Sequence, residues 1–82
     1  MLNTTIIETF QNNCNEIYKL NEEYAEEPTY LLIVDDIYSN TATDCYDLYY
    51  ILLGKLENYF EIKILTKKEL ESGKYMNYKK IY

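Results

Sequence analysis

Apolar residues recur at spacings of three and four in the first third of the chain, which is the period of one helix face. The stripe consists of Ile6, Phe10, Cys14, Ile17 and Tyr24. It predicts an amphipathic helix from Asn3 to about Glu26. Thr5 and Glu8 have the spacing of a capping box, so we expect the helix to begin near Thr5. Pro28 cannot continue a helix and is expected to end it.

The next apolar segment is continuous rather than periodic. Its centre, Tyr30 to Val34, is apolar at every position, which is typical of a β-strand that is covered on both faces. We therefore expect a central strand from Thr29 to about Ile37.

Cap-forming residues from Ser39 to Thr43 predict the start of a second helix, which we expect to run from about Thr43 to Asn58. Asp44 and Asp47 are expected in its first turn, where the helix dipole favours negative charge. Its expected buried stripe is Leu48, Ile51, Leu52, Leu56 and Tyr59. Gly54 interrupts the helix interior and indicates a close approach to the sheet.

The rest of the chain is divided into short elements. Isoleucines alternate with charged residues from Phe60 to Thr66, which predicts a half-buried strand. A second capping-box spacing at Thr66 to Glu69, followed by Gly73, predicts a short helix from Lys67 to Ser72. The last segment, Lys74 to Tyr82, is expected to be an edge strand that carries lysines.

The order of these elements predicts the fold class. A strand, a helix and a strand within about 37 residues form a βαβ unit, in which the two strands are parallel. We expect an α/β fold of order α-β-α-β-short α-β, with a three-stranded sheet that contains one βαβ unit and an N-terminal amphipathic helix packed on it. The 82 residues are expected to form a single domain, 1–82.

Composition argues against several functional classes. The chain has no histidine and two glycines, so it lacks the usual general base, catalytic triads and glycine-rich phosphate loops, and we expect neither an enzyme nor a cofactor. Cys14 and Cys45 lack the spacing of a zinc site, nothing supports a disulfide between them, and Cys14 is expected in the core. No apolar run is long enough for a membrane span and Met1 begins no secretory pattern, so we expect a cytoplasmic protein.

Acidic residues are concentrated in one part of the chain. Glu16 to Asp47 contains nine acidic residues and one lysine, a net charge of −8, whereas Asn58 to Tyr82 carries +3. The whole chain carries −6, which argues against direct binding of nucleic acid. One interpretation is that the acids only solvate the surface. The other is that they converge at one end of the molecule and, with the tyrosines between them, imitate the phosphates and bases of a nucleic acid. The candidate partner-binding residues are then Glu22, Glu23, Glu26, Glu27, Asp35, Asp36, Asp44, Asp47, Tyr24, Tyr38 and Tyr46.

The segment LLIVDD, the helix start after it and the strand EIKIL resemble the first β-α-β of a response-regulator receiver domain over residues 30–66. In that family, adjacent acids at the end of the first strand help to bind magnesium beside a phosphoacceptor aspartate, and Asp35 and Asp36 match their positions. No aspartate follows Leu65, so the resemblance does not include the phosphoacceptor. A magnesium site that is formed by Asp35, Asp36 and Asp44 is the hypothesis that remains.

In size, acidity and tyrosine content the whole chain is similar to the small acidic inhibitors of phages and mobile elements, such as anti-CRISPR proteins and other nucleic-acid mimics. This resemblance implies inhibition of a basic nucleic-acid-binding host protein, such as a CRISPR effector or another nuclease or DNA-processing protein, in the host cytoplasm. The alternative is a structural or regulatory interaction module, or a homodimer, that uses an apolar and tyrosine-rich surface.

Overall fold

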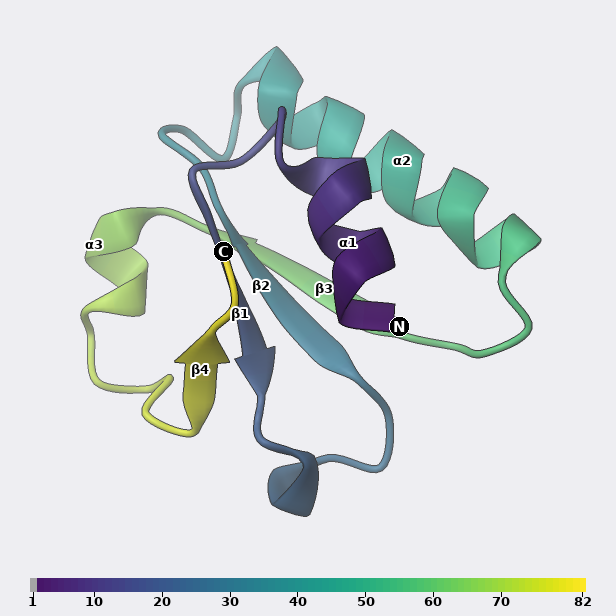
Figure 1. Ribbon diagram of the computed structural model, residues 1–82. Coiled ribbons are helices and arrows are strands. Elements are labelled where there is room, and N and C mark those ends of the chain that lie inside the picture. The colour runs from purple at the N-terminus through teal and green to yellow at the C-terminus, as the bar shows by residue number, and fades with distance from the viewer. Residues whose placement is uncertain (1) are drawn as a thin grey trace.

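The computed structural model of the protein describes residues 2–82, which form a four-stranded mixed sheet with helices on both faces (Figure 1). In chain order the elements are α1 (Leu2–Phe10), β1 (Glu16–Leu20), the 3₁₀ helix η1 (Glu22–Tyr24), β2 (Thr29–Ile33), α2 (Asn40–Lys55), β3 (Glu61–Leu65), α3 (Lys67–Leu70) and β4 (Tyr78–Lys80). The strand order across the sheet is β3-β2-β1-β4. This confirms the small α/β fold, but the expected three-stranded sheet is wrong by one strand.

The additional strand is β1, which the sequence pattern placed inside a long first helix. α1 ends at Phe10, and the next five residues include three asparagines, which favour turns over helix. The expected helix from Asn3 to Glu26 is therefore wrong. Ile17 does face the same core as α1, but it reaches this core from a strand whose alternate side chain, Tyr18, faces the other way.

The expected boundaries of that first helix also change. α1 begins at Leu2, so Thr5 lies inside the helix and not at its cap. Pro28 does not end a helix, because it lies in the connection that leads from η1 into β2. Both expectations followed from joining two separate apolar segments into one period.

The centre of the sheet agrees with the sequence. β2 lies between β1, to which it is antiparallel, and β3, to which it is parallel. The segment from β2 through α2 to β3 is thus the expected βαβ unit. Residues 30–33 of β2 are all buried, as expected of a strand that is covered on both faces.

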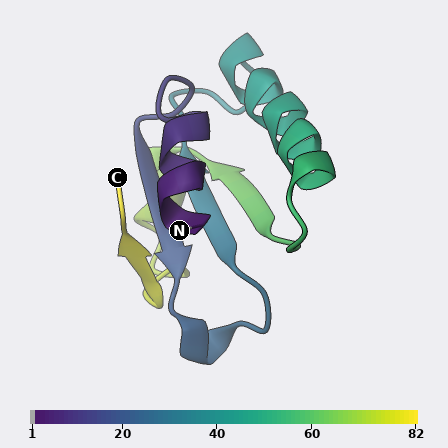
Figure 2. The same ribbon diagram turned by 45° about the vertical axis from the view of Figure 1, so that its right-hand side comes forward.

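Each face of the sheet has its own cluster of apolar side chains. Figure 2 shows α1 and α2 together on one side of the sheet. Tyr30 and Leu32 of β2 face α1 and α2 in the larger cluster, and the Tyr30 hydroxyl donates to Asn3 Oδ1 of α1 at 2.7 Å. Leu31 and Ile33 face the opposite side, where α3 and the segment before β4 cover them. The alternation of side chains along one strand therefore joins both layers.

α2 begins earlier than expected and presents a different face. Ser39 caps it, because its Oγ accepts from the backbone N–H of Ala42 at 3.2 Å. Asp44 and Asp47 consequently lie beyond the first turn. The buried residues are Ala42, Cys45, Tyr49 and Leu52. Two residues of the expected stripe, Ile51 and Tyr59, are instead about half exposed. No atom lies within 4 Å of a Cβ built on Gly54, so the expected close approach to the sheet is wrong.

The C-terminal elements largely follow the sequence. Thr66 Oγ1 accepts from the backbone N–H of Glu69 at 3.4 Å and caps α3, as its capping-box spacing predicts. Gly73 has a φ of +92°, which a residue with a side chain rarely adopts. β4 is an edge strand that carries Lys79 and Lys80, although it is shorter than expected. Within residues 2–82, no helix combines the length and the apolar composition needed to cross a membrane.

Candidate functional site

The structure separates the eight candidate acids into two groups. Glu22, Glu23, Glu26 and Glu27 lie in the connection between β1 and β2, and we call them the loop acids. Asp35, Asp36, Asp44 and Asp47 follow β2 or lie on α2, and we call them the helix-end acids. β1 and β2 form a hairpin, so the loop acids precede β2 and the Asp35-Asp36 pair follows it, at the two ends of a strand about 17 Å long (Figure 1). The acids therefore do not converge at one end of the molecule as expected.

The loop acids surround the one-turn helix η1. All four are exposed, and so is Tyr24, which projects from the same turn. Among them, only Glu22 has an ion-pair partner within residues 2–82, Lys19 Nζ at 3.4 Å. The Glu22 side chain is 89% exposed, so this pair contributes little to stability.

Two of the helix-end acids shape the turn between β2 and α2. Asp35 Oδ1 accepts from Asn15 Nδ2 at 2.8 Å, which ties this turn to the residue before β1. Asp36 Oδ1 accepts from the backbone N–H of Tyr38 at 2.9 Å, and its carbonyl accepts from the Ser39 hydroxyl at 2.7 Å. The aspartate pair thus holds the loop that leads into the cap of α2.

The other helix-end acids point into solvent from α2. Asp44 and Asp47 are exposed, with Tyr46 between them in sequence, and Tyr38 of the preceding turn is 90% exposed. None of the four helix-end aspartates forms a salt bridge with a lysine of residues 2–82. This surface therefore combines four carboxylates without cationic partners and two exposed phenol rings.

Asp35, Asp36 and Asp44 are not gathered into a group of three metal-ligating side chains. In the part of the chain that the structure describes, no group of three or more histidine, cysteine or acidic side chains is arranged to hold a metal ion. A cavity of about 460 Å³ adjoins Asp35 and Asp36, but its other lining residues are mostly amides and hydroxyls. β1 pairs with β2 on the side away from β3 and contains no aspartate that could act as the phosphoacceptor of a receiver domain.

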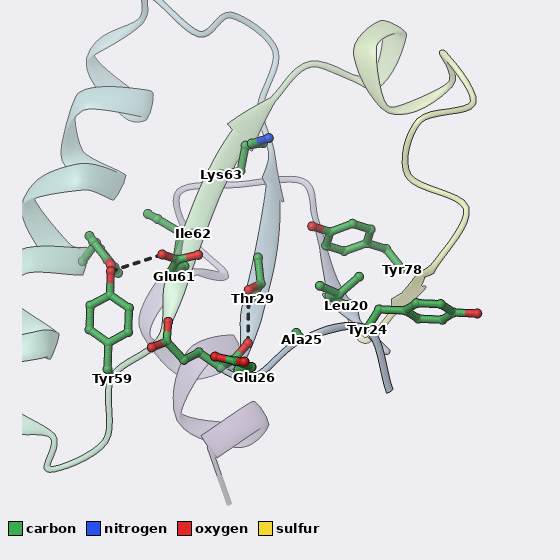
Figure 3. Close-up of a pocket in the computed structure, with 12 residues that line it drawn as sticks. Leu20, Tyr24, Ala25, Glu26, Thr29, Tyr59, Glu61, Ile62, Lys63 and Tyr78 are labelled. Carbon is green, nitrogen blue, oxygen red and sulfur yellow. Dashed lines mark hydrogen bonds between the residues drawn. The ribbon is translucent and has the colours of Figure 1, made fainter. Parts of the chain in front are cut away.

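A groove of about 700 Å³ lies at the end of the sheet near η1 (Figure 3). It is lined by four tyrosines, three glutamates and one lysine, and its other lining residues are apolar or small. The charged and aromatic lining residues are Tyr24, Tyr49, Tyr59, Tyr78, Glu26, Glu27, Glu61 and Lys63. Figure 3 shows Tyr59 beside β3, with Tyr24 and Tyr78 on the other side of the groove.

Sequence reasoning found only part of this groove. It identified Tyr24, Glu26 and Glu27 through the acidic segment, but it missed the residues that α2, β3 and β4 contribute. The polar positions Glu61 and Lys63 of the alternating strand were an available sign, because they mark the side of β3 that faces away from the larger core.

The shifted pKa values of tyrosines and cysteines all lie farther from neutrality. Burial raises the pKa of Cys14 to about 12 and of Cys45 to about 11, so both thiols stay protonated. Burial raises the pKa of Tyr30 to about 12. The pKa of Tyr49 is also raised, mainly by burial, with Tyr59 and Glu61 adding to it. These groups act as packing residues and neutral hydrogen-bond donors.

Comparison of the chain with protein-family models, curated proteins and solved structures found no match.

Proposed function

We propose that this protein is a non-enzymatic, acidic binding protein that occupies the nucleic-acid-binding surface of a basic partner protein. The observation that carries this proposal is the surface of the helix-end acids. Its four carboxylates are exposed and lack lysine partners within residues 2–82, and the same segment, residues 35–47, exposes the rings of Tyr38 and Tyr46.

The spacing of these charges is compatible with phosphate mimicry. Asp44 and Asp47 are three residues apart on a helix, which corresponds to about 4.5 Å along its axis. One strand of DNA carries a charge about every 3.4 Å along the duplex axis. The phenol rings add amphipathic contact area at a low cost in side-chain entropy, as in other binding surfaces that are rich in tyrosine. A groove lined by lysine and arginine is the complementary partner surface.

The pattern of pKa shifts and the composition support binding over catalysis. The buried thiols and phenols have raised pKa values, and the chain has no histidine. The net charge of −6 favours fast, salt-sensitive association with a basic partner. The loop acids contribute to this long-range attraction from the other end of β2.

Two variants with the same net charge test which acids form the contact. The first changes the four helix-end aspartates to asparagine, which keeps the acceptor oxygens that hold the turn. The second changes the four loop glutamates to glutamine and is the matched control, because each variant changes the net charge of the protein from −6 to −2. Both are immobilised and used to capture proteins from a bacterial lysate at low and high salt, with and without duplex DNA as competitor.

We expect the wild-type protein and the loop variant to capture a nucleic-acid-binding protein that duplex DNA displaces and that high salt releases. The helix-end variant is expected to lose this capture at least tenfold. Equal capture by the helix-end variant, or capture that DNA does not displace, contradicts the proposal.

The outer face of α2 favours one second candidate, an interaction module or homodimer that uses apolar contacts. Tyr46, Tyr50 and Ile51 are 45%, 68% and 55% exposed, respectively, on this helix. This function predicts association that persists at high salt and in the asparagine variant. Changing Tyr50 and Ile51 to serine is then expected to abolish it, as measured by sedimentation velocity for a homodimer.

A further inference from the structure

β3 is an edge strand with an open outer side. On its inner side, the Glu61 N–H donates to the Pro28 carbonyl at 2.9 Å, and the Leu65 carbonyl accepts from the Val34 N–H at 2.8 Å. Backbone groups alternate in direction along a strand, so every second residue of β3 faces β2. The residues between them, Ile62 and Ile64, direct their N–H and C=O groups away from the sheet.

The fold satisfies only the first outward group of this edge. The hydroxyl of Tyr49 on α2 donates to the Phe60 carbonyl at 2.7 Å, immediately before β3 begins. The backbone groups of Ile62 and Ile64 have no such partner within residues 2–82. Residues 61 to 63 border the 700 Å³ groove, so solvent reaches this part of the edge, and Ile64 beyond it is 7% exposed. Unpaired strand edges of this kind accept a further strand from another chain.

The opposite edge of the sheet is less suitable. β4 has three residues, and the N–H of its first residue, Tyr78, is already bonded to the Tyr75 carbonyl at 3.2 Å. Its other outward-facing residue is Lys80, whose side chain pairs with Glu16 at 2.9 Å. A short edge that carries lysine is a common protection against strand addition. β3 is therefore the edge that remains available.

The charges beside β3 indicate what kind of strand fits. Glu61 lies at the groove end of β3 together with Glu26 and Glu27, so a basic side chain at that end meets three carboxylates. Two residues along, Lys63 projects on the same face and favours an acidic neighbour. A second copy of the chain matches this register, because antiparallel pairing of two β3 strands about Ile62 places each Glu61 opposite Lys63 of the other copy. It is disfavoured because each copy carries −6, whereas a peptide segment with no net charge is not repelled.

We propose that β3 binds an extended peptide segment of a partner protein, which adds antiparallel to β3 as a fifth strand of the sheet. The segment carries an acidic residue opposite Lys63 and, two residues later, a basic residue opposite Glu61. Its intervening side chains are apolar and face the side of Ile62. This inference is independent of the nucleic-acid-mimic proposal, because it uses the other end of β2 and a peptide with no net charge.

The test uses two blocked peptides of identical composition, titrated into the ¹⁵N-labelled full-length protein. In the first, valines alternate with threonines, except that one glutamate is followed two positions later by one lysine. The second exchanges this glutamate and lysine. We expect the first peptide to bind about tenfold more tightly, because both cross-strand pairs are of opposite charge only in that register. The amide protons of Ile62 and Ile64 are expected to gain protection from hydrogen exchange.

Two controls separate strand addition from general adhesion. N-methylation of the two valines that flank the glutamate removes the donors aimed at β3 and is expected to abolish binding, whereas N-methylation of the alternate residues leaves it intact. The protein variant that carries both Glu61→Lys and Lys63→Glu is expected to prefer the second peptide. Both side chains are exposed, and each loses one surface contact, Glu61 with the Tyr59 hydroxyl at 3.4 Å and Lys63 with the Tyr75 ring at 5.8 Å, so this variant is expected to keep the fold.

Several results overturn the proposal. They are the absence of binding by either peptide, equal affinity for both, binding that survives N-methylation of the valines, or an unchanged preference in the charge-swapped variant. A protein that sediments as a dimer, and whose dimer the first peptide does not dissociate, shows that a second copy occupies the surface and likewise overturns it.

Discussion

Replacing Tyr49 by phenylalanine removes one buried hydroxyl and leaves the surrounding ring packing in place. Its hydroxyl donates to the Phe60 carbonyl at 2.7 Å. The Tyr49 ring meets the Phe60 ring in a T-shaped contact at 5.1 Å, and Phe60 is fully buried. The hydrogen bond joins α2 to the chain just before β3, so it closes the βαβ unit at one end.

The expected loss of stability follows from the buried Phe60 carbonyl, which the substitution leaves without its hydrogen-bond donor. A neutral hydrogen bond contributes about 1 kcal/mol net, but a buried carbonyl that loses its donor costs about 1–3 kcal/mol. We therefore expect Tyr49→Phe to lower the free energy of unfolding by about 2 kcal/mol. For a domain of this size, that corresponds to a decrease in Tm of roughly 8–16 °C. The loss is large because single small domains are stable by only about 5–15 kcal/mol.

The measurement is urea unfolding followed by far-ultraviolet circular dichroism, since removal of a tyrosine alters the intrinsic fluorescence. Tyr50→Phe is the matched control. Tyr50 precedes Ile51 on the same helix and is 68% exposed, so loss of its hydroxyl is expected to change stability by less than about 0.5 kcal/mol. If Tyr49→Phe and Tyr50→Phe unfold at the same urea concentration, water replaces the lost donor at Phe60 and the reasoning is refuted.

Three further predictions concern charge, backbone and thiols. The Glu16 carboxylate accepts hydrogen bonds from Lys67 of α3 at 2.8 Å and Lys80 of β4 at 2.9 Å, and these bonds lower its pKa. The contribution of Glu16 to the free energy of unfolding is therefore present at neutral pH. It is lost as the pH falls below 4.5, the ordinary pKa of the carboxyl group. Glu16→Gln should cost about 1 kcal/mol at pH 7 in urea unfolding and less at pH 3, and an equal cost at both pH values would contradict this. Gly54→Ala should raise the stability of the protein by up to about 1 kcal/mol, because Gly54 lies in a helix with open space around its Cα. Gly73→Ala should lower the stability by about 1 kcal/mol, because Gly73 has a positive φ. Shifts of the same sign in the Tm of the two variants would disprove these two predictions. Native Cys14 and Cys45 should resist iodoacetamide at pH 7.5, since burial raises the pKa of each thiol; rapid labelling detected by mass spectrometry would show that the core opens readily.

Local sequence was sufficient to predict an element where its pattern of buried side chains fits only one type of secondary structure. Four consecutive buried positions in β2 require a strand with both faces covered, and the order of β2, α2 and β3 then requires a parallel pair. Thr66 as a cap and Gly73 as a positive-φ residue were also predictable, because the chemistry of each position is set by its near neighbours.

The segment from Glu16 to Leu20 shows where local information ends. Ile17 continues the helical spacing of Ile6 and Phe10, yet the segment is a strand, because pairing with β2 and β4 satisfies its backbone groups on both sides. These partners lie as far away as the last residues of the chain, and no window of neighbouring residues contains them.

The sequence by itself thus determined the charge, the tyrosine content, the central βαβ unit and the Thr66 cap of α3. Tertiary structure alone decided that the loop acids and the helix-end acids lie at opposite ends of β2, since a hairpin in place of the long helix reverses the chain between them. It also decided that tyrosines of α2 and β4 line one groove, and that β3 lies at an open edge. These features depend on which strands pair, and strand pairing is set by contacts between residues that are distant in sequence.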